Sequence, residues 1–223
     1  MGLYNSNQSE NQWFLPLITG MAILLFIPMF ILQRLGWFDF WWWMSSNLLL
    51  LISLVWFNDH TFRQEIRDDL NSRIPYKILI GVFSALLLYG VFALGNLLIR
   101  SIFPGGAENI SGVYDFKGSA SELRIFLLML LIIGPGEELF WRGFLQARLM
   151  KRWGTKKGFI AATLIYTGVH LLTGNPVLIL AALTAGIFWG LMYLYFRSLT
   201  ANMLSHIIWD ISIFLLLPME SLF

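Results

Sequence analysis

The chain has 223 residues, of which 57% are hydrophobic and only 13% are charged. Soluble domains usually carry about 25% charged residues, so this composition excludes a soluble globular enzyme as well as a disordered chain. The lack of cysteine excludes a disulfide scaffold, and a net charge of +2 is too small to indicate a nucleic-acid partner. The sequence therefore predicts an all-α, polytopic membrane protein.

Seven apolar stretches predict transmembrane helices, because a bilayer core of about 30 Å requires about 20 apolar residues per helix. They lie at residues 13–33, 37–57, 78–99, 122–147, 158–173, 176–196 and 198–217. Together they leave no room for a separate soluble domain, and residues 104–120 read as a plain connecting loop. Gly186 and Gly190 in the sixth stretch form a G-x-x-x-G pattern, which predicts close helix packing within the bundle rather than dimerisation.

The distribution of Lys and Arg predicts the orientation of the bundle. Residues 58–77 contain four of these cations and residues 148–157 contain five, whereas residues 100–124 contain three. The positive-inside rule then places the N-terminus in the cytoplasm and the C-terminus outside, with the cell membrane as the expected location. We expect no cleaved signal peptide, because the polar start has no basic region before its first apolar run.

Three charged residues interrupt the fourth stretch, namely Glu137, Glu138 and Arg142. Left unpaired at mid-membrane, they would together cost roughly 8–10 kcal/mol. Glu138 and Arg142 are four residues apart and share a helix face, so they are expected to pair. Glu137 lies about 100° around the helix and remains free to act. A purely structural salt bridge would explain Glu138 and Arg142 but would leave Glu137 without a partner.

Two later stretches also contain polar residues, with His170 in the fifth and His206 and Asp210 in the seventh. Because a helix rises 1.5 Å per residue, Glu137, His170 and His206 are expected about 21, 20 and 14 Å from the cytoplasmic side. Separate helices thus place their polar residues at similar depths. This agreement predicts one polar site inside the membrane.

The residues of this site fit the hydrolysis of an amide bond. A glutamate and a histidine that converge on a water molecule can activate it as a nucleophile, and a second histidine can donate to the developing oxyanion. Alternatively, His170, His206 and a carboxylate would hold a zinc ion with one open position. The H-E-x-x-H zinc signature does not occur in the sequence. Zinc therefore remains possible, and the metal-free interpretation is preferred.

The motifs resemble those of the CPBP intramembrane proteases, also called the CAAX-protease or Abi family. Glu137, Glu138 and Arg142 match its E-E-x-x-x-R motif, while Tyr166 and His170 match F-x-x-x-H with Tyr in place of Phe. His206 and Asp210 match the third motif, H-x-x-x-N/D. The resemblance implies a catalytic core at residues 122–217, preceded by N-terminal transmembrane helices and loops at residues 1–121.

The same resemblance implies a role for each position. Glu137 and His170 would activate the water, with Glu138 and Arg142 supporting the site. His206 and Asp210 would lie where the family stabilises the oxyanion, although an ionised Asp cannot donate a hydrogen bond as Asn can. The expected substrate is a membrane-associated or lipidated protein or peptide, and the resemblance indicates no particular oligomeric state.

Two other functions remain open at this stage. One is a non-catalytic membrane scaffold or a bacteriocin-immunity-type binding protein with the same motifs. The other is a small transporter that uses its buried acids for proton coupling, although no internal repeat supports it.

Overall fold

The computed structural model describes residues 13–222 of the chain. A short antiparallel hairpin of β1 and β2 joins the first two helices. The elements of the first half are α1 (Phe14–Leu32), β1 (Arg34–Leu35), β2 (Phe38–Asp39), α2 (Phe40–Asn58), α3 (His60–Leu70), α4 (Ile74–Ile102) and α5 (Gly106–Tyr114). Those of the second half are α6 (Glu122–Leu128), α7 (Gly134–Glu137), α8 (Ala147–Trp153), α9 (Thr155–Gly168), α10 (Pro176–Phe196) and α11 (Leu199–Ile211).

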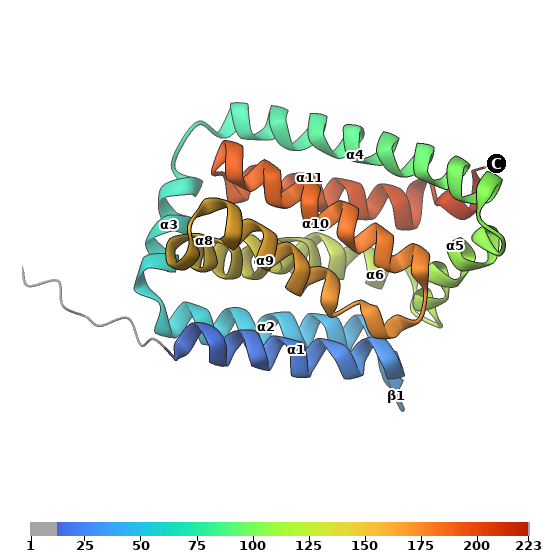
Figure 1. The fold of residues 1–223 in the computed structure, drawn as a ribbon, viewed down its shortest axis with the longest axis horizontal. Helices are drawn as coiled ribbons and strands as arrows, with labels where there is room; N and C mark the ends of the chain where they lie inside the picture. Colours follow the sequence, from blue (N-terminus) through green and yellow to red (C-terminus); the bar gives the residue numbers. More distant parts are fainter. Residues whose placement is uncertain (1–12, 223) are drawn as a thin grey trace, which may run out of the picture.

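The helices form a bundle with the polar residues of the second half at its centre. In Figure 1, α1 and α2 run side by side along one face, α4 runs along the opposite face, and α9, α10 and α11 lie between them. Within residues 13–222, five helices are long and apolar enough to cross a membrane: α1, α2, α4, α10, and α11 with its π-helical extension to Leu216. The predicted all-α membrane bundle is therefore confirmed.

The two remaining predicted spans have a less regular form. The fourth is a continuous series of short segments from Glu122 to Trp153, in which π-helical turns at Met129–Ile133 and Glu138–Gln146 flank α7. Pro135, near the start of α7, lacks the backbone N–H that a regular helix would require there. The fifth span is covered by α9, which has only 14 residues. Each segment packs one side against the bundle and leaves apolar side chains exposed on the other, such as Leu131 and Leu164.

The prediction of a plain loop at residues 104–120 was wrong. Most of this segment forms α5, followed by a 3-10 turn at Asp115–Lys117. Ile110 and Tyr114 are spaced four residues apart and are both buried. The Tyr114 hydroxyl donates a hydrogen bond to the carbonyl of Ile213 at 3.0 Å and accepts one from the amide of Met219 at 2.7 Å. These contacts attach α5 to the end of the chain.

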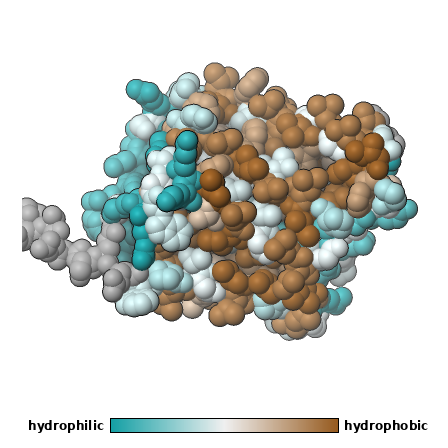
Figure 2. Space-filling view, in the orientation of Figure 1, coloured by the Kyte–Doolittle hydropathy of each residue, from teal (hydrophilic) through white to brown (hydrophobic). Residues whose placement is uncertain are grey.

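A second helix, α3, occupies the predicted loop at residues 58–77. Its N-cap is Asp59, whose carboxylate accepts a hydrogen bond from the amide of Phe62 at 2.9 Å. Phe62 and Ile66 are buried, whereas the opposite side of the helix is charged. Figure 2 shows hydrophilic side chains gathered at the end of the molecule where α3 and α8 lie, next to a broad apolar region. We call residues 59–77 and 148–157 the basic end.

Small residues allow the central helices to approach closely. A Cβ added at Gly190 would lie 2.7 Å from the Phe159 ring, and one at Gly186 would lie 3.1 Å from the Tyr166 ring. The G-x-x-x-G pattern of α10 therefore packs against α9 within the bundle, as predicted. At Gly134, an added Cβ would lie 2.8 Å from the side chain of Ile207. This contact brings α7 against α11 and so positions the two sets of polar residues described next.

Candidate active site

Glu138 is the centre of a buried polar network. Its Oε1 accepts hydrogen bonds from Nη1 of Arg142 at 2.8 Å and from Nδ1 of His206 at 2.7 Å. Its Oε2 accepts one from Nδ2 of Asn202 at 2.9 Å. The predicted pairing of Glu138 with Arg142 is therefore present. With both oxygens occupied and a fully buried side chain, Glu138 organises the site and is not available as a base.

Arg142 is surrounded by aromatic rings as well as by its carboxylate partner. Its guanidinium carbon lies 4.7 Å from the ring centre of Tyr166 and 5.6 Å from that of Trp189. Nη2 also donates to the carbonyl of Ala185 at 3.4 Å. Cation–π contacts are stronger where water is excluded, so these rings help to compensate a cation buried in the bundle.

His206 lies between two carboxylates. While Nδ1 donates to Glu138, Nε2 lies 3.5 Å from Oδ1 of Asp210. The imidazole stacks on Trp189, with ring centres 3.7 Å apart and ring planes 20° apart. Because Nδ1 donates to Glu138 and a neutral imidazole donates from one nitrogen only, His206 can donate from Nε2 only as an imidazolium.

His170 is not inside a helix, as the sequence had predicted. Helix α9 ends at Gly168, and His170 immediately precedes a 3-10 turn at Leu171–Thr173. Its Nδ1 lies 2.8 Å from the carbonyl of Tyr166, one turn earlier. A carbonyl only accepts hydrogen bonds, so Nδ1 carries the proton and Nε2 of the neutral ring keeps a free lone pair. The ring itself packs on Phe30 of α1 at 4.4 Å between centres.

Glu137 differs from its neighbour Glu138 in having an unsatisfied oxygen. The carboxylate is buried and forms a side-chain hydrogen bond with Tyr166. Among the residues that the structure describes, Oε2 of Glu137 has no hydrogen-bond partner. Buried polar atoms are rarely left in this state unless they have a functional role or bind water. The two adjacent glutamates therefore have separate environments, as predicted.

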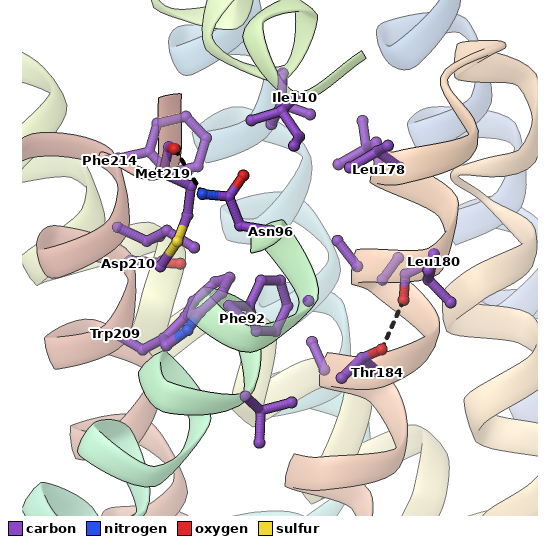
Figure 3. Close-up of a pocket in the computed structure, with 18 of the residues that line it drawn as sticks. Phe92, Asn96, Ile110, Leu178, Leu180, Thr184, Trp209, Asp210, Phe214 and Met219 are labelled. Atoms are coloured by element: carbon purple, nitrogen blue, oxygen red, sulfur yellow. Dashed lines mark hydrogen bonds between the residues drawn. The ribbon is translucent and has the colours of Figure 1, made fainter. Parts of the chain in front are cut away.

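Four of the six predicted site residues face one cavity of about 290 Å³, namely Glu137, His170, His206 and Asp210. Glu138 and Arg142 lie behind this wall and contact its residues. Figure 3 shows the cavity between α4, which contributes Phe92 and Asn96, and α10, which contributes Leu178, Leu180 and Thr184. The structure thus brings together side chains from the fourth, fifth and seventh predicted spans in a largely apolar enclosure.

The far end of the cavity is closed by the segment after α11. Nδ2 of Asn96 donates to the carbonyl of Met219 at 2.9 Å and to that of Leu222 at 3.2 Å. Nε of Arg100 donates to Oδ1 of Asn96 at 2.9 Å, which fixes the orientation of the amide. Met219 is buried beside Asp210 and Trp209 (Figure 3).

Asn202 and Trp189 contribute to the site but were not predicted. Asn202 is fully buried and donates to the carbonyl of Trp189 at 2.9 Å as well as to Glu138. A signal was present in the sequence, because Asn202, His206 and Asp210 follow one another at intervals of four and share one helix face. Nothing in the spacing of Trp189, which lies within an apolar run, distinguishes it from an ordinary core residue.

The geometry also bears on the zinc alternative. Within residues 13–222, no three His, Cys, Asp or Glu side chains are arranged to hold one metal ion. Nδ1 of both site histidines is engaged by protein oxygens, and Oε1 of Glu138 is shared by two donors. We assign no step to a metal.

Fold and site together define an integral membrane protein with a carboxylate–histidine cavity inside a helical bundle. Residues 119–212 match the family model described as "Type II CAAX prenyl endopeptidase Rce1-like". The predicted resemblance is confirmed over these residues, and the match to this family of endopeptidases supports intramembrane protease activity in general. No curated protein and no solved structure matches the chain at a significant level.

Proposed function

We propose that the chain is an intramembrane endopeptidase in which Glu137 and His170 activate a water molecule. The observation that carries this proposal is the unpartnered Oε2 of Glu137, which lies in the wall of the same cavity as His170 and His206. A carboxylate without a partner at that position can accept a proton. The lone pair at Nε2 of His170 supplies a second acceptor from another side of the cavity.

In the first step, the water oxygen attacks the carbonyl carbon of the peptide bond while Glu137 takes a proton from the water. The carbonyl oxygen becomes an oxyanion, and His206 stabilises it from Nε2. Asp210 positions the His206 ring and stabilises its positive charge. An ionised Asp can do both, although it cannot itself donate a hydrogen bond to the oxyanion. Removal of a single oxyanion donor costs about 10²–10³ in kcat in well-studied enzymes, so His206 carries a substantial part of the rate.

In the second step, the tetrahedral intermediate collapses and the bond between carbon and nitrogen breaks. Glu137 returns its proton to the leaving amine, which gives one new carboxylate terminus and one new amine terminus. Glu138 and Arg142 act as positioning residues in both steps, because Glu138 holds Nδ1 of His206 and Arg142 neutralises Glu138.

The apolar lining of the cavity supports a membrane-associated or lipidated protein or peptide as the substrate.

We infer that the basic end faces the cytoplasm in the cell membrane, which would place the C-terminus outside. The expected cytoplasmic N-terminus belongs to residues 1–12, which lie outside the described residues. The mechanism requires no cofactor, so activity should survive exhaustive chelation.

The test compares the N-termini and C-termini of membrane proteins in cells that express either the wild type or Glu137→Gln at matched levels. Termini that appear only with the wild type would establish a protease and identify its substrate. Glu220→Gln serves as a control acid outside the cavity. If the profiles are identical while a cellular phenotype survives Glu137→Gln, the chain acts as a scaffold or transporter and the proposal fails.

A further inference from the structure

A second cavity of about 230 Å³ lies at the basic end, and none of its lining residues belongs to the catalytic motifs. It forms where the start of α4 meets the junction of α10 and α11. Its polar lining comes from Asp69, Arg73, Lys77 and Arg197, and its apolar lining from Tyr76 and Phe196. Three cations against one carboxylate give this cavity a net positive charge.

One of the three cations is fully used by the protein itself. Lys77 is buried and forms an ion pair with Oδ1 of Asp69 at 2.8 Å. Oδ2 of Asp69 accepts hydrogen bonds from the amide and the hydroxyl of Thr200 at 2.7 and 2.5 Å. This pair connects α3 and α4 to the first turn of α11. It neutralises the single acid of the cavity, so the charge of the two arginines is not compensated there.

The two arginines are held at the rim by the ends of their helices. Arg73 is the N-cap residue of α4 and Arg197 the C-cap residue of α10, and both have left-handed backbone conformations. Among the described residues, the guanidinium of Arg73 has no hydrogen-bond or ion-pair partner. That of Arg197 lies 5.9 Å from the ring centre of Tyr193. Planar guanidinium groups match phosphate oxygens in bidentate geometry.

We propose that this cavity binds the phosphate of an anionic phospholipid headgroup. The apolar surroundings favour a lipid over free phosphate. Tyr76, Leu79 and Phe83 on α4 are 52%, 67% and 66% exposed, and Phe196 on α10 is 47% exposed. In a membrane these side chains face lipid, so acyl chains attached to the bound phosphate would lie along α4. The cavity would thereby fix the depth of the bundle at one leaflet.

The probe is phosphatidylglycerol, compared with phosphatidylcholine of the same acyl chains, and titrated onto the detergent-purified full chain by native mass spectrometry. The wild type should prefer phosphatidylglycerol, and Arg73→Gln combined with Arg197→Gln should bind it about tenfold more weakly. The matched control is Arg67→Gln combined with Lys156→Gln, which removes two exposed cations of the basic end outside this cavity. That control should keep the preference.

A cavity variant that keeps its preference, or a control variant that loses it equally, would overturn the proposal. Inorganic phosphate provides a third arm. If phosphate displaces phosphatidylglycerol at equal concentration, the ligand is a soluble phosphate and the lipid assignment is wrong. Arg73→Gln alone keeps the test valid if the double variant unfolds, because that side chain has no partner to lose within residues 13–222. Protease activity is a separate readout, and its loss or retention does not affect this test.

Discussion

Glu138 and His206 are 68 residues apart in the sequence, yet Oε1 of one lies 2.7 Å from Nδ1 of the other. The contact joins the π-helical turn after α7 to α11, and Gly134 allows the two helices to approach closely enough for it. The same carboxylate holds Arg142 and Asn202. One acid therefore organises the site, and its sequence neighbour Glu137 is left to react.

We expect the two glutamates to respond differently to the same substitution. Glu138→Gln removes a buried charge that Arg142 and His206 both require, and breaking such a network costs about 3–5 kcal/mol of unfolding free energy. Glu137→Gln should leave stability nearly unchanged and abolish cleavage. Thermal unfolding of both purified variants, together with the analysis of termini, separates the two effects. Equal loss of stability in both variants would refute this division of roles.

Asp210 is predicted to act by positioning His206. Asp210→Asn keeps a hydrogen-bonding group near Nε2 and should retain activity within about tenfold, whereas Asp210→Leu should lose about 10²-fold or more. The expected loss is in kcat rather than KM, because the oxyanion forms only in the transition state. A Leu variant that cleaves as well as the Asn variant would show that Asp210 has no part in orienting the ring.

Gly158 is predicted to set the position of α9 and therefore of His170. A Cβ at this position would lie 2.3 Å from the backbone nitrogen of Met150, so Gly158→Ala must move α9 away from α8. We expect lower stability and reduced cleavage. Gly168→Ala, on the same helix, is the control, because an added Cβ there meets nothing within 4 Å. Similar unfolding temperatures for the two variants would contradict this explanation.

The ion pair between Asp59 and Arg148 predicts acid sensitivity at the basic end. Burial, the largest single cause, raises the pKa of Asp59, but the hydrogen bonds from Arg148 and the Phe62 amide and the nearby positive charges together outweigh it and hold the pKa below its ordinary value of 3.8. A lowered folded-state pKa contributes stability above the unfolded-state pKa, and this contribution is lost as the pH falls through the folded value. Stability should therefore decrease below about pH 4.

Asp59→Asn should flatten that decrease, because Asn still caps α3 but does not titrate. The measurement is the unfolding temperature between pH 3 and pH 6, with exposed Asp68→Asn as the control. An Asp59→Asn curve that keeps the full acid slope of the wild type would assign the effect to other groups.

Orientation can be measured cleanly because the chain has no cysteine. Lys156→Cys lies at the basic end and Ser119→Cys near the opposite end, and both positions are exposed. In intact cells, a membrane-impermeant maleimide should label Ser119→Cys only, and lysis should allow both to react. Labelling of Lys156→Cys in intact cells would reverse the predicted topology.

Sequence reasoning located most of this site because charge inside an apolar helix is a strong signal. Spacing of four residues correctly paired Glu138 with Arg142 and placed His206 beside Asp210. The sixth predicted span agrees with α10 in its bounds, since Asn175 caps it and Pro176 begins it. These features depend on local chemistry, which a single sequence contains.

Other features depend on tertiary contacts and were missed for that reason. Helix α5 forms because Tyr114 reaches backbone groups about 100 residues away, and no local pattern marks that contact. The stacking of Trp189 on His206 likewise requires knowledge of how α10 meets α11. Helix α9 ends at Gly168, a residue with low helix propensity that an apolar run of this length did not single out as its end.

The π-helical turns on both sides of α7 have a consequence for how related chains should be aligned. Each such turn closes with a hydrogen bond to the fifth residue rather than the fourth and so accommodates extra residues within a helix. Deleting one residue from Met129–Ile133 would restore regular winding and leave α6 on the same side of the bundle, because the π-helical turn already absorbs that residue locally. Relatives that lack one residue there would keep both the same catalytic face and the same side of α6 toward the bundle, so a single gap at this position belongs in their alignment.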